Sequence, residues 1–273
     1  MNQKALLVCI VAGILVIIGA AIAVTLGMPE EETEDVPGDP LNPADFAAAE
    51  AVDGSKPAQS DGEEDKMWNA GLFEGDMANF DPSVGKNAIR GEHFRWPKNT
   101  VPYEISRVFS SKERSIIARG MNEYKKNTCL RFIPRTSERD YIYITKEGGC
   151  WSYVGRNGGK QKISLDRGCV YVETVIHEFM HAVGFHHEQS RSDRDEYVTI
   201  IKENIKPGME HNFQSYSQEE ITHLGAKYDY CSVMHYPEQA FRKVKKIIFS
   251  EIILWSCSET GVEDDREEGS QPL

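Results

Sequence analysis

The spacing of apolar side chains predicts two helices in the middle of the chain. Between residues 170 and 184, apolar residues recur at the 3.6-residue period of a helix with one core-facing side. They are Val172, Val175, Ile176, Phe179 and Val183. We expect an earlier helix to begin after Ser110, which can form a capping box with Glu113, and to reach about Lys126.

Four shorter stretches alternate or cluster apolar residues as strands do. They cover residues 101–105, 130–133, 141–145 and 162–165. A turn is expected at residues 157–159, which read Asn-Gly-Gly. After Gly184 the periodic signals become fewer. We therefore expect an α+β fold, with a sheet-and-helix lobe before Gly184 and an irregular lobe after it.

An apolar run at the N-terminus follows Lys4 and covers residues 5–27, broken only by Thr25. It is long enough to span a bilayer, and small residues at 21–23 offer a signal-peptidase site. If it is cleaved, the chain is secreted. If it is not, it anchors a single-pass type II membrane protein with Lys4 in the cytoplasm. Both alternatives place the remaining chain outside the cell.

The acidic charge lies in the front part of the chain. Residues 1–86 contain 4 Lys or Arg and 16 Asp or Glu residues, so the net charge of −12 belongs to this segment. Residues 28–66 contain few large apolar groups, which predicts a disordered linker. No basic block suggests a nucleic-acid partner.

The strongest chemical signal is a histidine motif on the second predicted helix. Residues 177–188 read His-Glu-Phe-Met-His-Ala-Val-Gly-Phe-His-His-Glu. Residues four apart share a helix face, so His177 and His181 can bind one metal ion together. Gly184 can take a positive φ, end the helix and let His187 return as a third ligand. Three imidazoles leave one zinc position open for water, as in catalytic sites, with Glu178 beside the ion.

The alternative for this motif is a helix whose histidines face solvent. Five fixed positions in eleven would match by chance in roughly one in ten thousand chains of this length. The sequence therefore predicts one bound Zn²⁺ per chain.

A Met-containing turn supports the same chemistry. Residues 232–236 read Ser-Val-Met-His-Tyr, about fifty residues after the motif. Together with Glu188 directly after the third histidine, and with blocks at 149–155 and 164–169, this turn resembles the astacin family of metzincin zinc endopeptidases. The resemblance covers roughly residues 72–242. It implies a two-lobed zincin fold with a mixed β-sheet in the N-terminal lobe and a zinc-binding active-site helix.

The resemblance also implies roles for single residues. Glu178 would be the general base that acts on water and then protonates the leaving amine. Tyr236 would be a fifth zinc ligand that moves to stabilise the oxyanion. Met234 would form the floor beneath the zinc, although ordinary core packing explains it equally well. The substrates would be proteins or peptides.

Residues 72–77, Leu-Phe-Glu-Gly-Asp-Met, resemble the family's F-x-G-D propeptide motif. This implies that Asp76 occupies the water position on zinc in a zymogen, whereas without the resemblance it could equally be a turn residue. A trypsin-like protease could cleave after Lys86, and the new amino group of Asn87 would then be buried against Glu188. The expected segments are a leader or anchor (1–27), a propeptide (28–86), a catalytic domain (87–257) and an acidic tail (258–273).

Cysteine usage fits an extracellular protein. The resemblance implies a disulfide between Cys150 and Cys169. It also implies that Cys129 pairs near the end of the domain, where Cys257 is the candidate, which leaves Cys231 over. A free thiol, another pairing or an intermolecular bridge all remain open for the odd cysteine.

After Arg242 the resemblance is lost, so we expect the catalytic domain to diverge there and its C-terminal lobe to be truncated. Two other function classes stay open. One is a catalytically inactive, secreted binding or decoy protein, and the other is a membrane-tethered structural protein that uses zinc for stability alone. The second would need a fourth permanent protein ligand. The complete histidine motif favours an active endopeptidase over both.

Overall fold

The computed structural model describes residues 35–56, 70–78, 92–217, 221, 224–238, 240–243, 246 and 248–251. The chain divides into two units, Met1–Val36 and Pro37–Leu273. Only Asp35 and Val36 of the first unit are described, so the apolar run at 5–27 lies outside the described residues. Within the described part, no helix has the length and apolar character needed to cross a membrane. All helices and strands of the described residues lie in the second unit.

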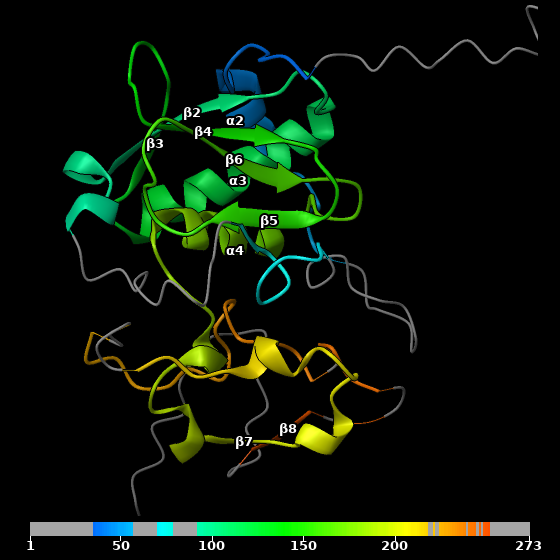
Figure 1. Ribbon diagram of the computed structural model, residues 1–273. Helices are drawn as coiled ribbons and strands as arrows, with labels where there is room; N and C mark the ends of the chain where they lie inside the picture. Colours follow the sequence, from blue (N-terminus) through cyan, green and yellow to red (C-terminus); the bar gives the residue numbers. More distant parts are fainter. Residues whose placement is uncertain are drawn as a thin grey trace, which may run out of the picture. The chain divides into compact units, whose positions relative to one another are not determined.

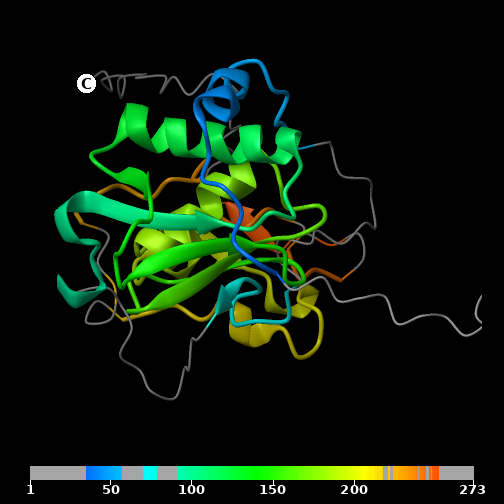
Figure 2. The same ribbon diagram turned by 90° about the horizontal axis from the view of Figure 1, so that it is seen from above.

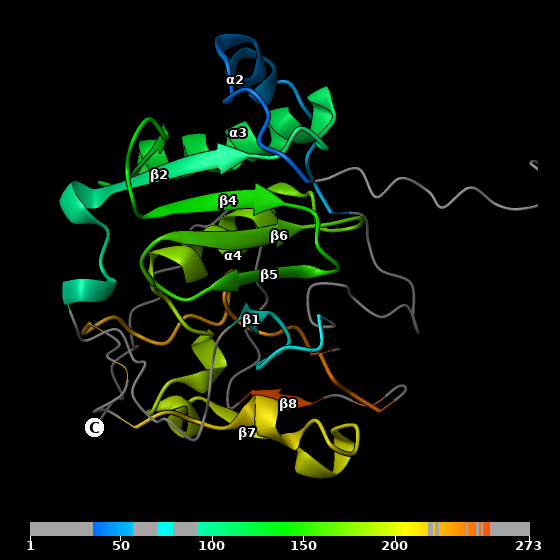
Figure 3. The same ribbon diagram turned by 45° about the horizontal axis from the view of Figure 1, so that its top comes forward.

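The main sheet has six strands in the order β1-β5-β6-β4-β2-β3 (Figures 1 and 3). They are β1 (Met77–Ala78), β2 (Thr100–Ile105), β3 (Arg131–Pro134), β4 (Tyr141–Thr145), β5 (Cys150–Tyr153) and β6 (Lys160–Leu165). All neighbouring pairs are parallel except β5 and β6, which are antiparallel. The sheet is therefore mixed, as expected. Central β4 consists of β-branched and aromatic residues, and all of its side chains are buried.

The four expected strands are confirmed, with ends that differ by two residues or fewer. Strand β5 was not expected, because Cys-Trp-Ser-Tyr carries no strong alternation. The same holds for β1, whose two residues are a strand only because they pair with β5. Pairing between distant segments defines both strands, and the local pattern could not show it.

Two long helices lie on one side of this sheet, α3 (Ser111–Asn127) and α4 (Val172–Val183) (Figure 2). The capping box of α3 forms, with Glu113 N–H bonded to the Ser110 hydroxyl and the Glu113 carboxylate to Ser110 N–H. Helix α4 ends at Gly184, whose φ of 115° lies in the left-handed region. Both helix predictions are confirmed. The Tyr124 hydroxyl of α3 donates to the Ile176 carbonyl and joins the two helices.

The chain after Gly184 is more irregular, as expected. Its described residues form four short 3-10 helices and a two-stranded antiparallel sheet of β7 (Val198–Ile200) and β8 (Phe249–Glu251). The 3-10 helices are η4 (Glu188–Ser190), η5 (Arg194–Glu196), η6 (Lys202–Asn204) and η7 (Glu210–Phe213). Ile248 and Phe249 are buried in the core, so the segment beyond Arg242 contributes to the fold.

The expectation that residues 28–66 form a disordered linker is wrong for residues 35–56. Helix α2 (Pro43–Ala49) begins with a capping box between Asn42 and Asp45, with Pro43 at its first position. Leu41 and Ala49 are buried in the hydrophobic core. The acidic composition concealed this helix, although the Asn-Pro-Ala-Asp sequence is a recognisable helix start.

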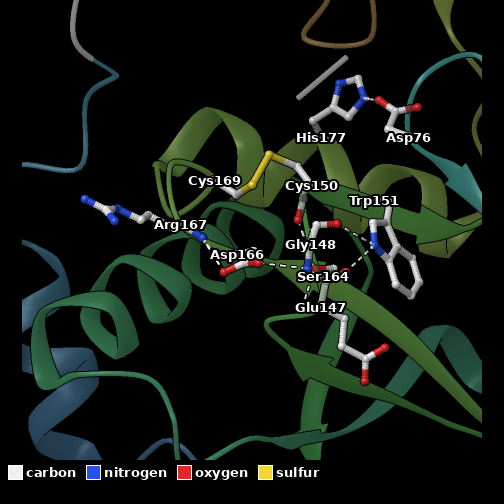
Figure 4. The surroundings of a disulfide bond; sticks show 11 residues. Asp76, Glu147, Gly148, Cys150, Trp151, Ser164, Asp166, Arg167, Cys169 and His177 are labelled. Atoms are coloured by element: carbon white, nitrogen blue, oxygen red, sulfur yellow. Dashed lines mark hydrogen bonds and ion pairs between the residues drawn. A yellow bond between two sulfur atoms is a disulfide. The ribbon is translucent and has the colours of Figure 1, made fainter. Parts of the chain in front are cut away.

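One expected disulfide is confirmed, whereas the expectation for the other cysteines is wrong. Cys150 and Cys169 form a disulfide that joins β5 to the turn before α4 (Figure 4). Cys129 is free and exposed, whereas Cys231 is disulfide-bonded. The expectation that Cys129 is bridged and Cys231 left over is therefore wrong, and Cys257 lies outside the described residues. Spacing in sequence carries no information on which distant cysteines meet.

Replacing both Cys150 and Cys169 by alanine is expected to lower the free energy of unfolding by about 3 kcal/mol. The bond closes a loop with a sequence separation of 19 residues, and a cross-link of this length restricts the unfolded chain by about that amount. Urea unfolding followed by tryptophan fluorescence measures the change. The matched control, Cys129→Ala, should leave the midpoint unchanged, and a double variant as stable as this control would contradict the prediction.

Candidate metal centre

Four buried side chains from two distant parts of the sequence lie close together. They are Asp76, His177, His181 and His187, and each offers one ligand atom within 4.8 Å of the others. Asp76 Oδ2 lies 3.1 Å from His177 Nε2 and 3.3 Å from His187 Nε2, and Asp76 Oδ1 lies 3.5 Å from His181 Nε2. Ligands at zinc–ligand distances of 2.0–2.1 Å in a tetrahedron are about 3.3 Å apart. The separations therefore fit a zinc ion at the centre.

The orientation of the histidines also fits a metal. Nδ1 of His177 lies 2.7 Å from the Val233 carbonyl, and Nδ1 of His181 lies 2.8 Å from the Phe185 carbonyl. A carbonyl can only accept, so Nδ1 carries the proton and the Nε2 lone pair of each neutral ring faces the centre. Burial lowers the pKa of His177, and that of His181 to about 4. Both rings are thus held neutral, the state that binds metal.

The third ring lies between two carboxylates. His187 Nδ1 is 2.6 Å from Glu74 Oε2, while its Nε2 faces Asp76. Burial opposes a positive charge on His187, but Asp76 and Glu74 outweigh it and raise its pKa to about 9. Conversely, burial opposes the charge of Asp76, but His187, His181 and the hydrogen bond with His177 hold its pKa well below the usual range. The site therefore favours positive charge at its centre.

Glu178 lies on α4 directly after the first histidine and is fully buried. No described group hydrogen-bonds to either of its carboxylate oxygens. Burial raises the pKa of Glu178 well above its usual value, and the nearby charge of Asp76 adds to this. A buried carboxylate without a partner is costly, so it indicates a group kept for chemistry with a molecule that enters the site.

Backbone contacts fix α4 beneath the sheet. The Trp96 indole donates to the Ala182 carbonyl at 2.8 Å, and Gly155 N–H donates to the His181 carbonyl at 2.8 Å. At the other end, the Cys150–Cys169 disulfide lies close to the start of α4, with Asp76 beside His177 (Figure 4). The ligand-bearing helix is thus held at both ends.

Asp76 belongs to a tight loop at residues 70–77. Gly75 N–H donates to the Leu72 carbonyl, and Ser152 N–H of β5 donates to the Asp76 carbonyl at 3.0 Å. Glu74 is fully buried with φ of 46°, a left-handed conformation that is costly for a non-glycine residue. Its carboxylate contacts His187 Nδ1 and accepts from the Ser190 hydroxyl at 2.9 Å. These contacts hold the loop over the three histidines.

The Met-containing turn lies against the same site. Met234 is buried, and its carbonyl accepts the Glu188 N–H at 2.9 Å. The Tyr236 hydroxyl donates to the Glu74 carbonyl at 2.6 Å. Burial, reinforced by Glu74 and Asp76, raises the pKa of Tyr236 well above its usual value, so this hydroxyl stays a neutral donor. A role for Tyr236 as a fifth ligand stays a prediction.

Glu188 occupies a separate, polar position. Its carboxylate accepts from Arg191 Nη1 at 2.8 Å and from Asp229 N–H at 2.9 Å. Burial raises the pKa of Glu188, although Asp229 N–H and Arg191 oppose this. Lys86 and Asn87 lie outside the described residues, so pairing of Glu188 with a new N-terminus stays a prediction.

Several residues at the site were not identified from the sequence. Glu74 and Ser190 gave no signal of their own, because Glu74 contacts both His187 and Ser190 across more than a hundred residues of chain. The one available indication for Glu74 was a charged residue inside an apolar stretch, Leu-Phe-Glu-Gly-Asp-Met.

The fold and the candidate metal centre together have the features of the zincin fold class. A family model described as Astacin (Peptidase family M12A) matches residues 88–252. The chain therefore belongs to the astacin family. The match continues beyond residue 242, so the expectation that the resemblance ends there is wrong. Pairing of β8 with β7 and burial of Ile248 explain why this apolar segment is part of the domain.

Similar proteins agree with this assignment. The chain is 48% identical over 160 residues to zinc metalloproteinase nas-4 of Caenorhabditis elegans, covering 58% of this chain and 51% of that protein. It is 47% identical over 196 residues to nas-13 of the same organism, covering 65% and 44%. The chain thus spans about half or less of the length of these curated relatives.

A solved structure is also similar. High choriolytic enzyme 1, a hatching enzyme zinc-protease from Oryzias latipes, has 36% sequence identity and a TM-score of 0.54. The similarity covers 65% of this chain and 86% of that one.

His177→Ala is expected to lower the zinc affinity of the full chain by more than about 100-fold. Loss of a group that only hydrogen-bonds to a metal ligand lowers metal affinity 10- to 100-fold. His177→Ala removes a ligand atom itself, so the loss should be larger. Zinc content after dialysis against a graded chelator measures the effect. His186→Ala, a neighbouring histidine outside the cluster, is the matched control. Equal zinc retention in both variants would show that the four-residue cluster does not hold the ion.

Proposed function

We propose that the protein is a zinc-dependent endopeptidase that is made as a latent zymogen. The observation that carries this proposal is the buried cluster of three histidine Nε2 atoms with Glu178 beside it and Asp76 on its remaining side. A zinc ion held there would polarise the scissile carbonyl and lower the pKa of a water molecule at the fourth position. In the latent chain Asp76 takes that fourth position.

Glu178 acts as the proton carrier. Its two carboxylate oxygens have no described hydrogen-bond partner, and Asp76 is close enough for its charge to raise the pKa of Glu178. One of these oxygens accepts a proton from the attacking water and delivers it to the nitrogen of the leaving amine. Because Glu178 is buried, bulk water has little access to its carboxylate and rarely takes up the proton in its place.

Tyr236 donates a hydrogen bond to the oxyanion. In the latent form its hydroxyl already donates to a peptide carbonyl, that of Glu74. When the loop at 70–77 leaves, the same neutral donor is available to the carbonyl of a substrate.

The substrate is an extended stretch of a protein or peptide. Once β1 leaves, β5 becomes an edge strand next to the histidines. Its free backbone groups can pair with a substrate strand, which positions a peptide bond without selecting particular side chains.

Activation follows removal of the N-terminal segment by a trypsin-like protease near Lys86. The catalytic part acts outside the cell, either secreted or anchored through residues 5–27, since a disulfide such as Cys150–Cys169 persists in oxidising compartments. Glu188 would then receive the new amino group near its present contacts with Arg191 and Asp229.

Glu178→Ala is expected to reduce kcat/KM for a quenched fluorescent peptide by about 10²- to 10⁴-fold after limited trypsin treatment, because the proton carrier is lost. Zinc content should stay at one ion per chain. Glu173→Ala, an exposed residue in the first turn of the same helix, is the matched control and should retain activity. Trypsin-treated, zinc-loaded parent protein without hydrolysis would instead favour an inactive binding protein.

Asp76→Ala is expected to raise peptide hydrolysis by the uncleaved chain at least about tenfold, because a charged ligand no longer excludes water from the metal. The rate is measured before any trypsin is added. Asp53→Ala, which changes an exposed carboxylate that is hydrogen-bonded to Ser55, is the control. If the Asp76 variant stayed as silent as this control while trypsin still activated it, Asp76 would not be the inhibitory ligand.

A further inference from the structure

We propose that residues 37–54, here named the α2 anchor, hold the propeptide on the catalytic domain independently of the metal centre. They keep it bound after the chain has been cleaved near Lys86. This inference rests on the proposed function in so far as it takes residues 28–86 as a propeptide. The α2 anchor precedes the residues that match the astacin family model, 88–252, so it is a feature outside the shared domain.

The α2 anchor and the loop at 70–78 contact different parts of the fold. Helix α2 packs against α3, whereas β1 pairs with β5. Figure 3 shows α2 near β2 and β1 beside β5, at opposite ends of the stacked strands. Two separate contact regions on one segment allow bivalent binding.

The centre of the α2 anchor is an arginine clamp. Arg114 of α3 forms an ion pair with Asp45 through Nη2 at 2.8 Å, and its Nε lies 3.4 Å from the other carboxylate oxygen. The same guanidinium donates to the carbonyls of Asp39 and Pro40 at 3.1 and 2.8 Å. Side-chain exposure is 14% for Arg114 and 8% for Asp45. A nearly buried, multiply bonded ion pair of this kind is specific to one docked geometry.

Apolar contacts surround the clamp. Leu41 and Ala49 are buried in the same core as Ile116 of α3, and Phe46 and Val52 pack against that core. Loss of the anchor would expose part of this surface to water, so its burial favours the bound state.

Backbone hydrogen bonds fix both ends of the α2 anchor. Gly38 N–H donates to the Ile105 carbonyl at the end of β2 at 2.8 Å. Arg119 donates to the Val52 carbonyl at 2.9 Å. The Gly54 carbonyl accepts the N–H of Val172 at 2.9 Å. Val172 is the first residue of α4, and the N-cap residue Tyr171 provides no side-chain cap.

The α2 anchor therefore partly caps the helix that carries His177 and His181. The first N–H groups of a helix lack partners within it, and Gly54 supplies one. A Cβ at Gly54 would lie 2.5 Å from the stiff side chain of Val172. Only glycine allows this close approach without displacement.

Cleavage after Lys86 leaves both contact regions, the α2 anchor and residues 70–78, on the same N-terminal fragment. Residues 55–69 join them, and a short tether of this kind gives an effective concentration in the millimolar range, which strengthens bivalent binding about 10²- to 10⁴-fold over one contact. Breaking the chain near Lys86 is thus insufficient for rapid release. A second cut between the two contact regions, for example after Lys56 or Lys66, would place them on separate fragments.

The test uses the full chain with Lys56→Gln and Lys66→Gln, so that limited trypsin can cut residues 5–86 only at Lys86. Size-exclusion chromatography with gel analysis then measures how fast the N-terminal fragment leaves the catalytic domain after dilution. The parent fragment is expected to co-elute with the domain. Asp45→Ala should raise the dissociation rate about 10- to 100-fold, the range of a buried charge-assisted contact.

Controls separate the proposed contact from general destabilisation. Glu50→Ala removes an exposed carboxylate of the same segment and should leave the dissociation rate unchanged. Arg114→Ala should have the same effect as Asp45→Ala, and the double variant should be no worse than either, because both remove one interaction. Asp76→Ala alone should leave the fragment bound through the α2 anchor, whereas Asp45→Ala combined with Asp76→Ala should release it.

Two results would overturn the proposal. One is immediate release of the parent fragment on cleavage, and the other is equal dissociation rates for Asp45→Ala and Glu50→Ala. Fragment retention is read without a substrate. A protein that never hydrolyses peptide but retains the fragment in this pattern would disprove the proposed function and leave the α2 anchor supported.

Discussion

The structure depends on one buried cluster of charge, the Asp76 carboxylate among three histidines. A carboxylate taken out of water must be compensated, or its burial costs several kcal/mol. Here the compensation comes from His177, His181 and His187, which are themselves oriented by carbonyls and by Glu74. The loop at 70–77, helix α4 and the turn at 232–236 must all be in place for this cluster to be satisfied. The cluster is therefore complete only when three segments that are distant in sequence pack together.

The N-terminal segment is part of that fold and not an appendage to it. It supplies a strand to the main sheet, apolar side chains to the core and a carbonyl to the start of α4. Its two contact regions lie on different elements, one at the metal centre and one on α3. One short segment of the chain therefore contributes both to the metal centre and to the hydrophobic core.

Local patterns predicted the parts of the molecule that local physics determines. The capping box at Ser110, the apolar period of α4 and the positive φ at Gly184 all follow from neighbouring residues, and so does the histidine spacing. Strand β5, the Glu74 contacts and the state of Cys129 depend on residues far away in sequence, so no local pattern reveals them. Helix α2 is the exception. Asn42 and Asp45 form a local helix-start signal, but the acidic composition of residues 28–66 led to the prediction of a disordered linker.

The parallel pairing of β1 with β5 has a consequence for association between copies of the chain. An unpaired strand edge is a template on which a second chain can form a sheet, and natural proteins protect such edges. While β1 is in place, Ser152 and Tyr153 of β5 are paired on the edge that does not face β6. A chain that keeps this pairing therefore offers less of the β5 edge to other chains.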